Sequence, residues 1–395
     1  MNDNTLIVGD IHLGKGLSIG KSNYGSLNSR ILDKINLLNW ILDKCDENYI
    51  SNIILLGDVF EDAKPDYLYV NILIDFIKKL RQKDIDIHII YGNHDIKRTG
   101  NSISSVLDLF QNYFEDYEYN NVHIYKSITT INIGKLSFTL IPFKDRKILN
   151  AVTHQEALDK IKNQLDFESS VIDFNNKKII LGHLTLEGSL YVGDEIDDYA
   201  NEIICPLSMF DNFDYVWMGH IHKPQVLKNL PRIAHLGSLD ISDFGETDHK
   251  KIVICINDNG FKEIEVPTRP LNKISISIPA KVDSTKFVLD EIKKLKLDES
   301  IVKIELKYLD LETKNVAREI IEKEILNMKA SHICSFNETR NVQVISDEKQ
   351  SEKLDNSVQV KSAIKKWAEK NKLSKDNYDL FLERSLAIVS EVDGK

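Results

Sequence analysis

Five short apolar runs, each ending in a glycine or a glycine-linked turn, constrain the fold of this chain more than any other feature. They read as buried strands and are TLIVGD (5–10), NIILLGD (52–58), IDIHIIYGNHD (85–95), KKIILGH (177–183) and YVWMGH (215–220). Apolar residues recur at helical spacing between the first two runs, from Ile31 to Cys45, and again over 67–80. This alternation predicts an α/β fold in which helices cover mostly parallel sheets.

The rest of the chain divides into two further parts. Hairpin signals at 129–143 and 250–266, the second with an Asn-Gly turn, predict antiparallel strands that join the sheets. After PTRP (267–270), strands and helices alternate in a small α+β unit, followed by a polar linker at 346–357 and two amphipathic helical patterns. The expected domains are therefore 1–268, 269–346 and 347–395.

Composition indicates a soluble globular protein, with 42% hydrophobic and 28% charged residues. The formal charge of −10 does not indicate nucleic-acid binding. A local basic face or bound cations can still supply a positive electrostatic field that the net charge does not reveal. The four cysteines lie far apart without a CxxC pair, which favours reduced thiols. We find no signal-peptide pattern and no apolar run long enough to cross a bilayer, so we expect a cytoplasmic protein without a membrane anchor.

Residue types that bind metals follow all five predicted strands. They are Asp10 and His12, Asp58, Asn93 with His94 and Asp95, His183, and finally His220 and His222. In open α/β sheets, sites form at the carboxyl ends of strands, so residues distant in sequence can converge there. The two histidines of GHIH alone could be one buried and one exposed residue. The repetition of the pattern after five strands favours a shared site instead.

The mixture of carboxylate, imidazole and one amide oxygen suits manganese, iron or zinc better than calcium or magnesium. These candidates are too many for one tetrahedral ion, and they fit two ions if one carboxylate is shared. Two ions about 3.5–4 Å apart can clamp a phosphoryl group and lower the pKa of a shared water toward about 7. The chemistry that this pattern indicates is hydrolysis of a phosphate ester.

These motifs resemble those of the calcineurin-like metallophosphoesterases, and within them the SbcD-type nucleases. The narrower likeness comes from GDIHLGKG at the start, GHLTLEGS (182–189) and HLGSLDISDFGE (235–246). The resemblance implies a two-sheet sandwich flanked by helices, a small α+β capping domain and a C-terminal helical segment that binds an SbcC-like ATPase. It is strong to about residue 266 and depends on layout alone beyond that point.

The resemblance also implies roles for individual residues. Asp10, His12 and His222 would hold one ion, Asn93, His183 and His220 the other, and Asp58 would bridge them. His94 would assist the leaving oxygen, and Asp95 would orient His94 by a hydrogen bond. The position three after Asp58 is Glu61, where relatives often have aspartate or histidine, and no role carries over to it.

The function implied is that of a metal-dependent DNA exonuclease or endonuclease, most simply with two Mn²⁺ ions. It would work as a homodimer with a coiled-coil ATPase in DNA end processing, repair or recombination. Helices expected near 67–80 and 103–117 resemble the dimer elements of that family. Two alternatives stay open: a phosphodiesterase acting on small molecules or nucleotides, and a non-catalytic scaffold for the ATPase. Both would share the fold, and the scaffold would have no need of the metal-binding residues.

Other histidines and basic residues have simpler interpretations. His88 lies inside a strand run and is expected to be a hydrogen-bonded core or sheet-face residue. His235 could approach the site, but a structural role is at least as fitting. Seven basic residues near the motif loops could form a phosphate-binding rim or could be solvated loop charges; they are Lys15, Lys21, Arg30, Lys97, Arg98, Lys144 and Arg146.

Overall fold

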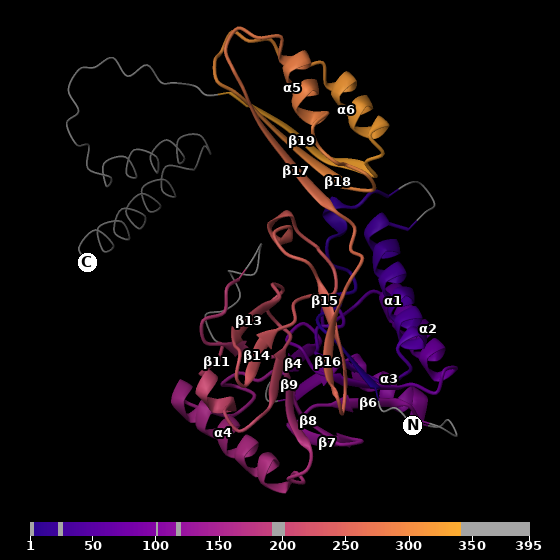
Figure 1. Ribbon diagram of the computed structural model, residues 1–395, viewed down its shortest axis with the longest axis vertical. Coiled ribbons are helices and arrows are strands. Elements are labelled where there is room, and N and C mark those ends of the chain that lie inside the picture. The colour runs from indigo at the N-terminus through magenta and orange to yellow at the C-terminus, as the bar shows by residue number, and fades with distance from the viewer. Residues whose placement is uncertain (1–3, 23–26, 100–101, 116–119, 192–201, 341–395) are drawn as a thin grey trace, which may run out of the picture. The chain divides into compact units, whose positions relative to one another are not determined.

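The computed structural model describes residues 4–22, 27–99, 102–115, 120–191 and 202–340. Its centre is a pair of six-stranded sheets (Figure 1). The strands of the first sheet, in spatial order, are β16 (Gly260–Glu265), β15 (Ile252–Asn257), β1 (Asn4–Val8), β2 (Ile50–Leu55), β3 (Asp86–Ile90) and β6 (Val122–Tyr125). The last four are parallel, whereas β15 is antiparallel to β1. β15 and β16 form the antiparallel hairpin that the Asn-Gly turn predicts.

The second sheet has the same size and a similar plan. Its strands in order are β13 (Gln225–Lys228), β14 (Arg232–His235), β12 (Tyr215–Met218), β9 (Lys177–Gly182), β8 (Leu136–Ile141) and β7 (Thr129–Ile133). The four inner strands are parallel, and each edge strand is antiparallel to its neighbour. All five predicted strands are confirmed, and they occupy inner positions where both faces are covered.

The two sheets pack face to face, and helices cover their outer faces. Ile7 and Ile54 of the first sheet share a buried cluster with Leu181 and Trp217 of the second. Helices α1 (Ser29–Glu47), α2 (Tyr67–Arg81) and α3 (Leu107–Glu115) lie against the first sheet, and α4 (His154–Val171) lies against the second. The expected α/β sandwich flanked by helices is confirmed. It brings the carboxyl ends of the parallel strands of both sheets to one edge.

A small α+β unit follows PTRP, as the sequence predicts. The strands β17 (Leu271–Ile278), β18 (Ile301–Tyr308) and β19 (His332–Arg340) form one parallel sheet, joined by α5 (Ser284–Ile292) and α6 (Arg318–Asn327). Both helices lie on one side of this sheet and bury a single apolar cluster against it (Figure 1). Two consecutive strand–helix–strand units account for this arrangement.

Short elements complete the described chain. They are the strands β4 (Ile96–Thr99), β5 (Ser102–Ser105), β10 (Thr185–Leu186) and β11 (Ile204–Cys205), and the 3₁₀ turns η1 (Leu17–Ile19), η3 (Leu207–Phe210) and η4 (Phe244–Glu246). The helix expected near 103–117 begins only at Leu107, because the residues before it pair with β4 as β5. The predicted linker at 346–357 and the two helical patterns after it lie outside the described residues.

Two negative expectations can be compared with the structure. All four cysteines are free thiols. Within the described ranges, we find no helix that is both long enough and apolar enough to span a bilayer.

Candidate metal centre

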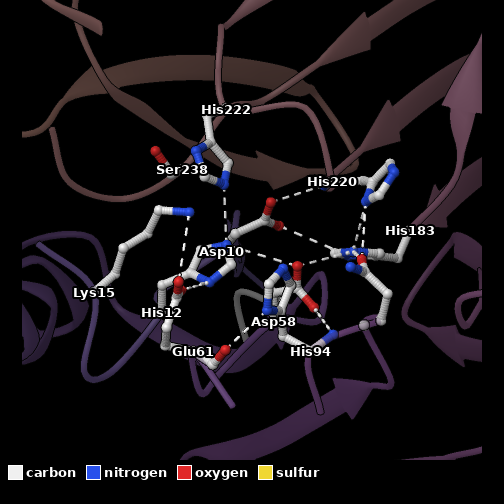
Figure 2. A network of polar contacts seen from close by, with 12 residues as sticks. Asp10, His12, Lys15, Asp58, Glu61, His94, His183, His220, His222 and Ser238 are labelled. Atoms are coloured by element: carbon white, nitrogen blue, oxygen red, sulfur yellow. Dashed lines mark hydrogen bonds and ion pairs between the residues drawn. The ribbon is translucent and has the colours of Figure 1, made fainter. Parts of the chain in front are cut away.

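The side chains that follow the five predicted strands meet at the edge where the carboxyl ends of both sheets come together (Figure 2). Asp10, His12 and Asp58 come from the first sheet, and His183, His220 and His222 come from the second. Their ligand atoms fall into compact groups: Asp10, His12 and His222 form one, and Asp58, His183 and His220 form another. Within each group these atoms all lie within 4.8 Å of one another.

In the first group the imidazoles of His12 and His222 are in a T-shaped arrangement, with an interplanar angle of 70°. The Nε2 atoms of His12 and His222 are 3.0 Å apart, and both rings are buried. The Asp10 carboxylate accepts a hydrogen bond of 2.8 Å from the backbone N–H of His220, which ties this group to the GHIH turn. The segment after β14 closes over the group, since Leu239 N–H donates to the Asp10 carbonyl and Ser238 N–H donates to that of His222.

The second group is organised around the Asn93 side chain. Its Oδ1 lies 2.9 Å from His183 Nε2 and 3.0 Å from His220 Nδ1, while those two ring nitrogens are 3.2 Å apart. The expected pairing of Asn93 with His183 and His220 is thus present in the geometry. Three groups capable of donating a lone pair point at one small volume.

Asp58 stands between the two groups. Its Oδ2 lies 3.2 Å from His183 Nε2 and 3.6 Å from His12 Nε2, while its Oδ1 accepts the backbone N–H of His94 at 2.9 Å. One carboxylate oxygen therefore faces a histidine of each group. This is the position that a bridging ligand would need.

The turns that carry these residues are backbone-strained and closely packed. His12, Asp58 and His220 have positive φ angles of 49°, 46° and 78°, a region that side chains other than glycine seldom adopt and that is concentrated at functional sites. The glycine before Asn93 is needed for a different reason. A Cβ on Gly92 would lie 2.0 Å from Asp58 Oδ1, so only glycine lets the two loops approach this closely.

His94 lies beside the two groups, but Asp95 does not orient it as expected. The Nδ1–H of His94 donates to the Glu61 carbonyl at 2.8 Å, while the Asp95 carboxylate accepts backbone N–H groups of Val59, Phe60 and Gly92 at 3.0–3.1 Å. The predicted hydrogen bond between Asp95 and His94 is wrong, because both Asp95 oxygens already bind the loops after β2 and β3. Asp95 instead fixes the loops that carry Asp58, Asn93 and His94.

The electrostatics of the buried groups suit cations. Burial is the largest influence on the pKa of His222 and lowers it to about 4, and burial also holds the pKa of His12 well below its ordinary value. Both rings are therefore neutral, and their nitrogens 3.0 Å apart have room for one proton at most. Burial opposes protonation of His183 too, but Asp58 and Asp10 outweigh it and raise its pKa to about 10.

A proton on His183 thus balances carboxylate charge when no ion is present. A divalent cation could replace that proton, and a second could satisfy the neutral His12–His222 pair. The donor set of the two groups therefore fits divalent ions.

Sequence reasoning missed two glutamates around the site, Glu202 and Glu246, and assigned no role to a third, Glu61. Glu61, Glu202 and Glu246 each contact the outer ring nitrogen of one histidine: His12, His220 and His222, respectively. Glu246 is the last residue of HLGSLDISDFGE, so its motif could be recognised in the sequence, but its contact with His222 could not. Glu202 stands in no motif, and only the tertiary fold brings it to His220.

Two other histidines have the structural roles that were expected or left open. His88 is buried, with Nδ1 2.9 Å from the Tyr125 hydroxyl and Nε2 3.3 Å from Asn52 Oδ1. His235 lies behind the site, where Nδ1 donates to the Gly219 carbonyl and Nε2 contacts Ser189 Oγ.

The basic residues near the loops do not form one rim. Arg30 is fully buried and donates to Asp33 and Asp240, each at 2.6 Å, so its inclusion among the rim residues was wrong. Lys144 is also buried and donates to the Lys126 carbonyl. Of the others, Lys15 lies next to the site and pairs with Glu61 at 3.8 Å, and Lys21 and Lys97 are exposed.

The chain is similar in sequence to a known protein and also matches solved structures. SbcD of Staphylococcus epidermidis, one of the subunits of nuclease SbcCD, is 27% identical over 277 residues, which are 68% of this chain and 70% of that protein. Among solved structures, a dimetal phosphatase from Danio rerio covers 67% of this chain and 98% of its own, with 12% identity and a TM-score of 0.40. GAP50, the anchor in the inner membrane complex of Plasmodium, covers 67% and 85%, with 16% identity and a TM-score of 0.40.

A family model described as calcineurin-like phosphoesterase matches residues 4–224. This range is more than half of the 395-residue chain, and it contains every candidate ligand from Asp10 to His222. The chain belongs to the calcineurin-like phosphoesterase family, a family of hydrolases that use divalent metals.

Proposed function

We propose that this protein is a metal-dependent DNA nuclease that acts in the cytoplasm as the nuclease subunit of an SbcCD-like complex. The observation that carries the chemistry is the meeting of five strand ends at two adjacent ligand groups, with Asp58 between them. DNA as the substrate is supported by the similarity to the SbcD protein of nuclease SbcCD. The reaction is hydrolysis of a phosphodiester bond, in exonuclease or endonuclease mode.

In this proposal each ligand group holds one divalent ion, most simply Mn²⁺. Asp10, His12 and His222 hold the first ion, Asn93, His183 and His220 hold the second, and Asp58 contacts both. Such a pair of ions, when bound, supplies Lewis acidity to the phosphoryl oxygens and lowers the pKa of the attacking water. The protein itself contributes rigid loops: the Asp95 carboxylate fixes those after β2 and β3, and the Ser238–Leu239 backbone fixes those after β1 and β12.

His94 acts on the leaving oxygen of the substrate. Its Nδ1–H is committed to the Glu61 carbonyl at 2.8 Å, which leaves Nε2 as the ring atom that can give a proton. The ring also lies edge-on to His12 with centroids 5.0 Å apart, next to the first ligand group. This placement suits a general acid that serves a phosphate ester held between the groups.

The domains of the chain are assigned on the resemblance and the layout. Residues 1–268 are the nuclease domain, 269–346 are a capping domain that selects DNA ends, and 347–395 bind an SbcC-like coiled-coil ATPase. The fold of the described part supports the second assignment, since β17 to β19 with α5 and α6 bury an apolar cluster of their own. The complex would serve DNA end processing in repair or recombination.

The test is cleavage of end-labelled duplex and single-stranded DNA by the purified full chain with Mn²⁺, beside a bis-nitrophenyl phosphate assay. His94→Ala should lower DNA cleavage by about 10²–10⁴-fold, the usual contribution of a general acid, while Mn²⁺ binding persists. His123→Ala changes a half-exposed histidine on β6 and should leave cleavage unchanged.

Two results would count against the proposal. Hydrolysis of the small diester with DNA left intact, even after an ATPase partner is added, would assign the site to a small-molecule phosphodiesterase. A chain that binds no divalent metal would be a scaffold.

A further inference from the structure

Three carboxylates surround the candidate metal centre without belonging to either ligand group. Glu61 Oε2 lies 2.7 Å from His12 Nδ1, Glu202 Oε1 lies 2.8 Å from His220 Nε2, and Glu246 Oε1 lies 3.2 Å from His222 Nδ1. They come from three unconnected segments: the loop after β2, the residues before β11, and η4. In each case the carboxylate meets the ring nitrogen that faces away from the centre.

For His220 and His222 this contact is a hydrogen bond, and it determines which ring nitrogen is the N–H. A carboxylate accepts hydrogen bonds and does not donate them, so the ring nitrogen beside it must be the N–H. The other nitrogen then keeps its lone pair. His222 thus presents Nε2 to the centre, where it lies 3.0 Å from His12 Nε2. His220 presents Nδ1, which lies 3.0 Å from Asn93 Oδ1.

His183 obeys the same rule through the backbone. Its Nδ1 donates to the Leu56 carbonyl at 2.6 Å, which leaves Nε2 directed at Asn93 and Asp58. Three imidazoles therefore have the outer nitrogen fixed by a hydrogen bond and direct the other nitrogen inward. Because a backbone carbonyl holds His183, only His220 and His222 depend on side chains that mutation can remove.

The glutamates are themselves held in place, so they are not mobile surface groups. Lys251 is buried and donates to Glu246 Oε2 at 2.7 Å, and also to Ser238 Oγ and the His222 carbonyl at 2.8 Å. Thr185 Oγ1 donates to Glu202 Oε2 at 2.6 Å. Lys15 pairs with Glu61 at 3.8 Å, as Figure 2 shows beside the His12 contact. Glu246 is the most enclosed of the three, at 1% exposure.

We propose that Glu202 and Glu246 are positioning residues that fix the tautomers of His220 and His222 and thereby help to build the two cation sites. This inference rests on the proposed two-metal function and assigns its supporting residues. Glu246 serves the group of Asp10, His12 and His222, whereas Glu202 serves the group of Asn93, His183 and His220. Carboxylates in such positions raise ligand basicity, and their loss usually costs 10–100-fold in metal affinity.

Loss of Glu246 should therefore weaken the binding of one ion, and loss of Glu202 should weaken the binding of the other. The experiment is calorimetric titration of the full chain with Mn²⁺, together with electron paramagnetic resonance of the loaded protein, whose spectrum reports coupling between two neighbouring Mn²⁺ ions. Wild type should bind two ions. Glu246→Gln and Glu202→Gln should each keep one tight site and bind the other ion 10–100-fold more weakly. The coupled spectrum should fade in both variants at limiting Mn²⁺.

The double variant and a matched control complete the design. Glu246→Gln combined with Glu202→Gln should weaken both sites, whereas each single variant weakens one. Glu265→Gln removes an exposed carboxylate that pairs with Lys250 on the β15–β16 hairpin, and it should bind Mn²⁺ as wild type does. Because Glu246→Gln leaves Lys251 buried with a weaker partner, its folding is checked by circular dichroism, and Glu202→Gln tests the same idea without a buried lysine.

The outcomes distinguish this inference from the proposed function. If both single variants bind two Mn²⁺ ions with wild-type affinity, or if both weaken the same ion, the positioning role is wrong. If wild type binds two ions and the variants behave as expected while DNA stays uncut, the DNA nuclease proposal fails and the positioning role stands.

Discussion

His88 shows at the scale of one residue what burial does to an imidazole that lies outside the metal centre. Burial is the largest influence on its pKa and lowers it to about 4, with His123 lowering it further and Asp86 opposing. The ring contacts Tyr125 and Asn52 and is neutral in the folded protein. In the unfolded chain the ring would take up a proton near pH 6.5.

Folding therefore becomes less favourable as the pH falls through this window. The stability linked to neutral His88 is complete above about pH 6.5 and is lost progressively toward pH 4, by about 3 kcal/mol in total. His88→Gln has no group to titrate, so its urea midpoint should fall less than that of wild type between pH 7 and pH 4.5. Equal losses in the two proteins would show that His88 does not carry this pH dependence.

The candidate ligands were predictable residue by residue, but their supports were not. Asp10, Asp58 and His183 could be identified because each follows a buried strand and a glycine, and strand ends of one sheet edge must meet. Glu202 reaches His220 through a fold contact that leaves no local pattern. The reason for Gly92 also became clear only in three dimensions, since its loop position suggested a sharp turn and the structure shows a close approach to Asp58.

At the scale of elements, α2 and α3 present apolar residues on two faces. Leu73, Phe76 and Phe114 pack into the core, whereas Val70, Ile74, Leu109 and Tyr113 line an outer pocket of about 440 Å³. Leu109 is 62% exposed. Because a two-fold axis lets one such patch cover its own copy, we propose that a second copy of this chain binds here.

A charge on this patch should separate the two copies. Leu109→Glu would bury a carboxylate in the interface, so it should shift the full chain from dimer to monomer in sedimentation velocity experiments. Phe174→Glu alters a side chain that is 90% exposed in the loop between α4 and β9, and it should leave the dimer intact. A wild-type chain that is monomeric at micromolar concentration would refute the dimer.

Strands and helices were predictable from the sequence where the burial of their residues gives a clear apolar pattern. The inner strands β1, β2 and β9 are covered on both faces, so their continuous apolar runs identified them. The predicted start of α3 was wrong. Ile103, Val106 and Leu107 fit helical spacing, but Ser102–Ser105 pairs with β4 as a strand. Periodicity over so few residues does not distinguish a strand from the first turn of a helix.

At the scale of the whole molecule, a buried ionic network links α1 to the segments on either side of it. Arg30 binds Asp33 and Asp240, and Asp33 in turn accepts from Arg269, shortly before β17. Lys34, one turn along α1, donates to the Ile11 carbonyl at 2.7 Å, between Asp10 and His12. The network therefore joins three segments that are far apart in the sequence.

Removal of its central cation should destabilise the protein strongly. Arg30→Met leaves Asp33 and Asp240 buried with fewer partners, and we expect a loss of about 3–5 kcal/mol in unfolding free energy. Lys83→Met breaks an exposed pair with Asp46 and should cost about 1 kcal/mol or less. Urea unfolding of both variants measures the difference, and similar losses would show that the Arg30 network is not a major source of stability.

The pairing of β1 with β15 also affects when the first sheet can be completed during translation. Residues 4–8 occupy an inner strand of the first sheet, yet one of their neighbours is residues 252–257. While the ribosome is still synthesising the first 250 residues, β1 has one unpaired edge, and His220 and His222 arrive only shortly before that edge is covered. The sheet and the candidate metal centre are therefore completed close together in time, late in translation of the two-sheet sandwich.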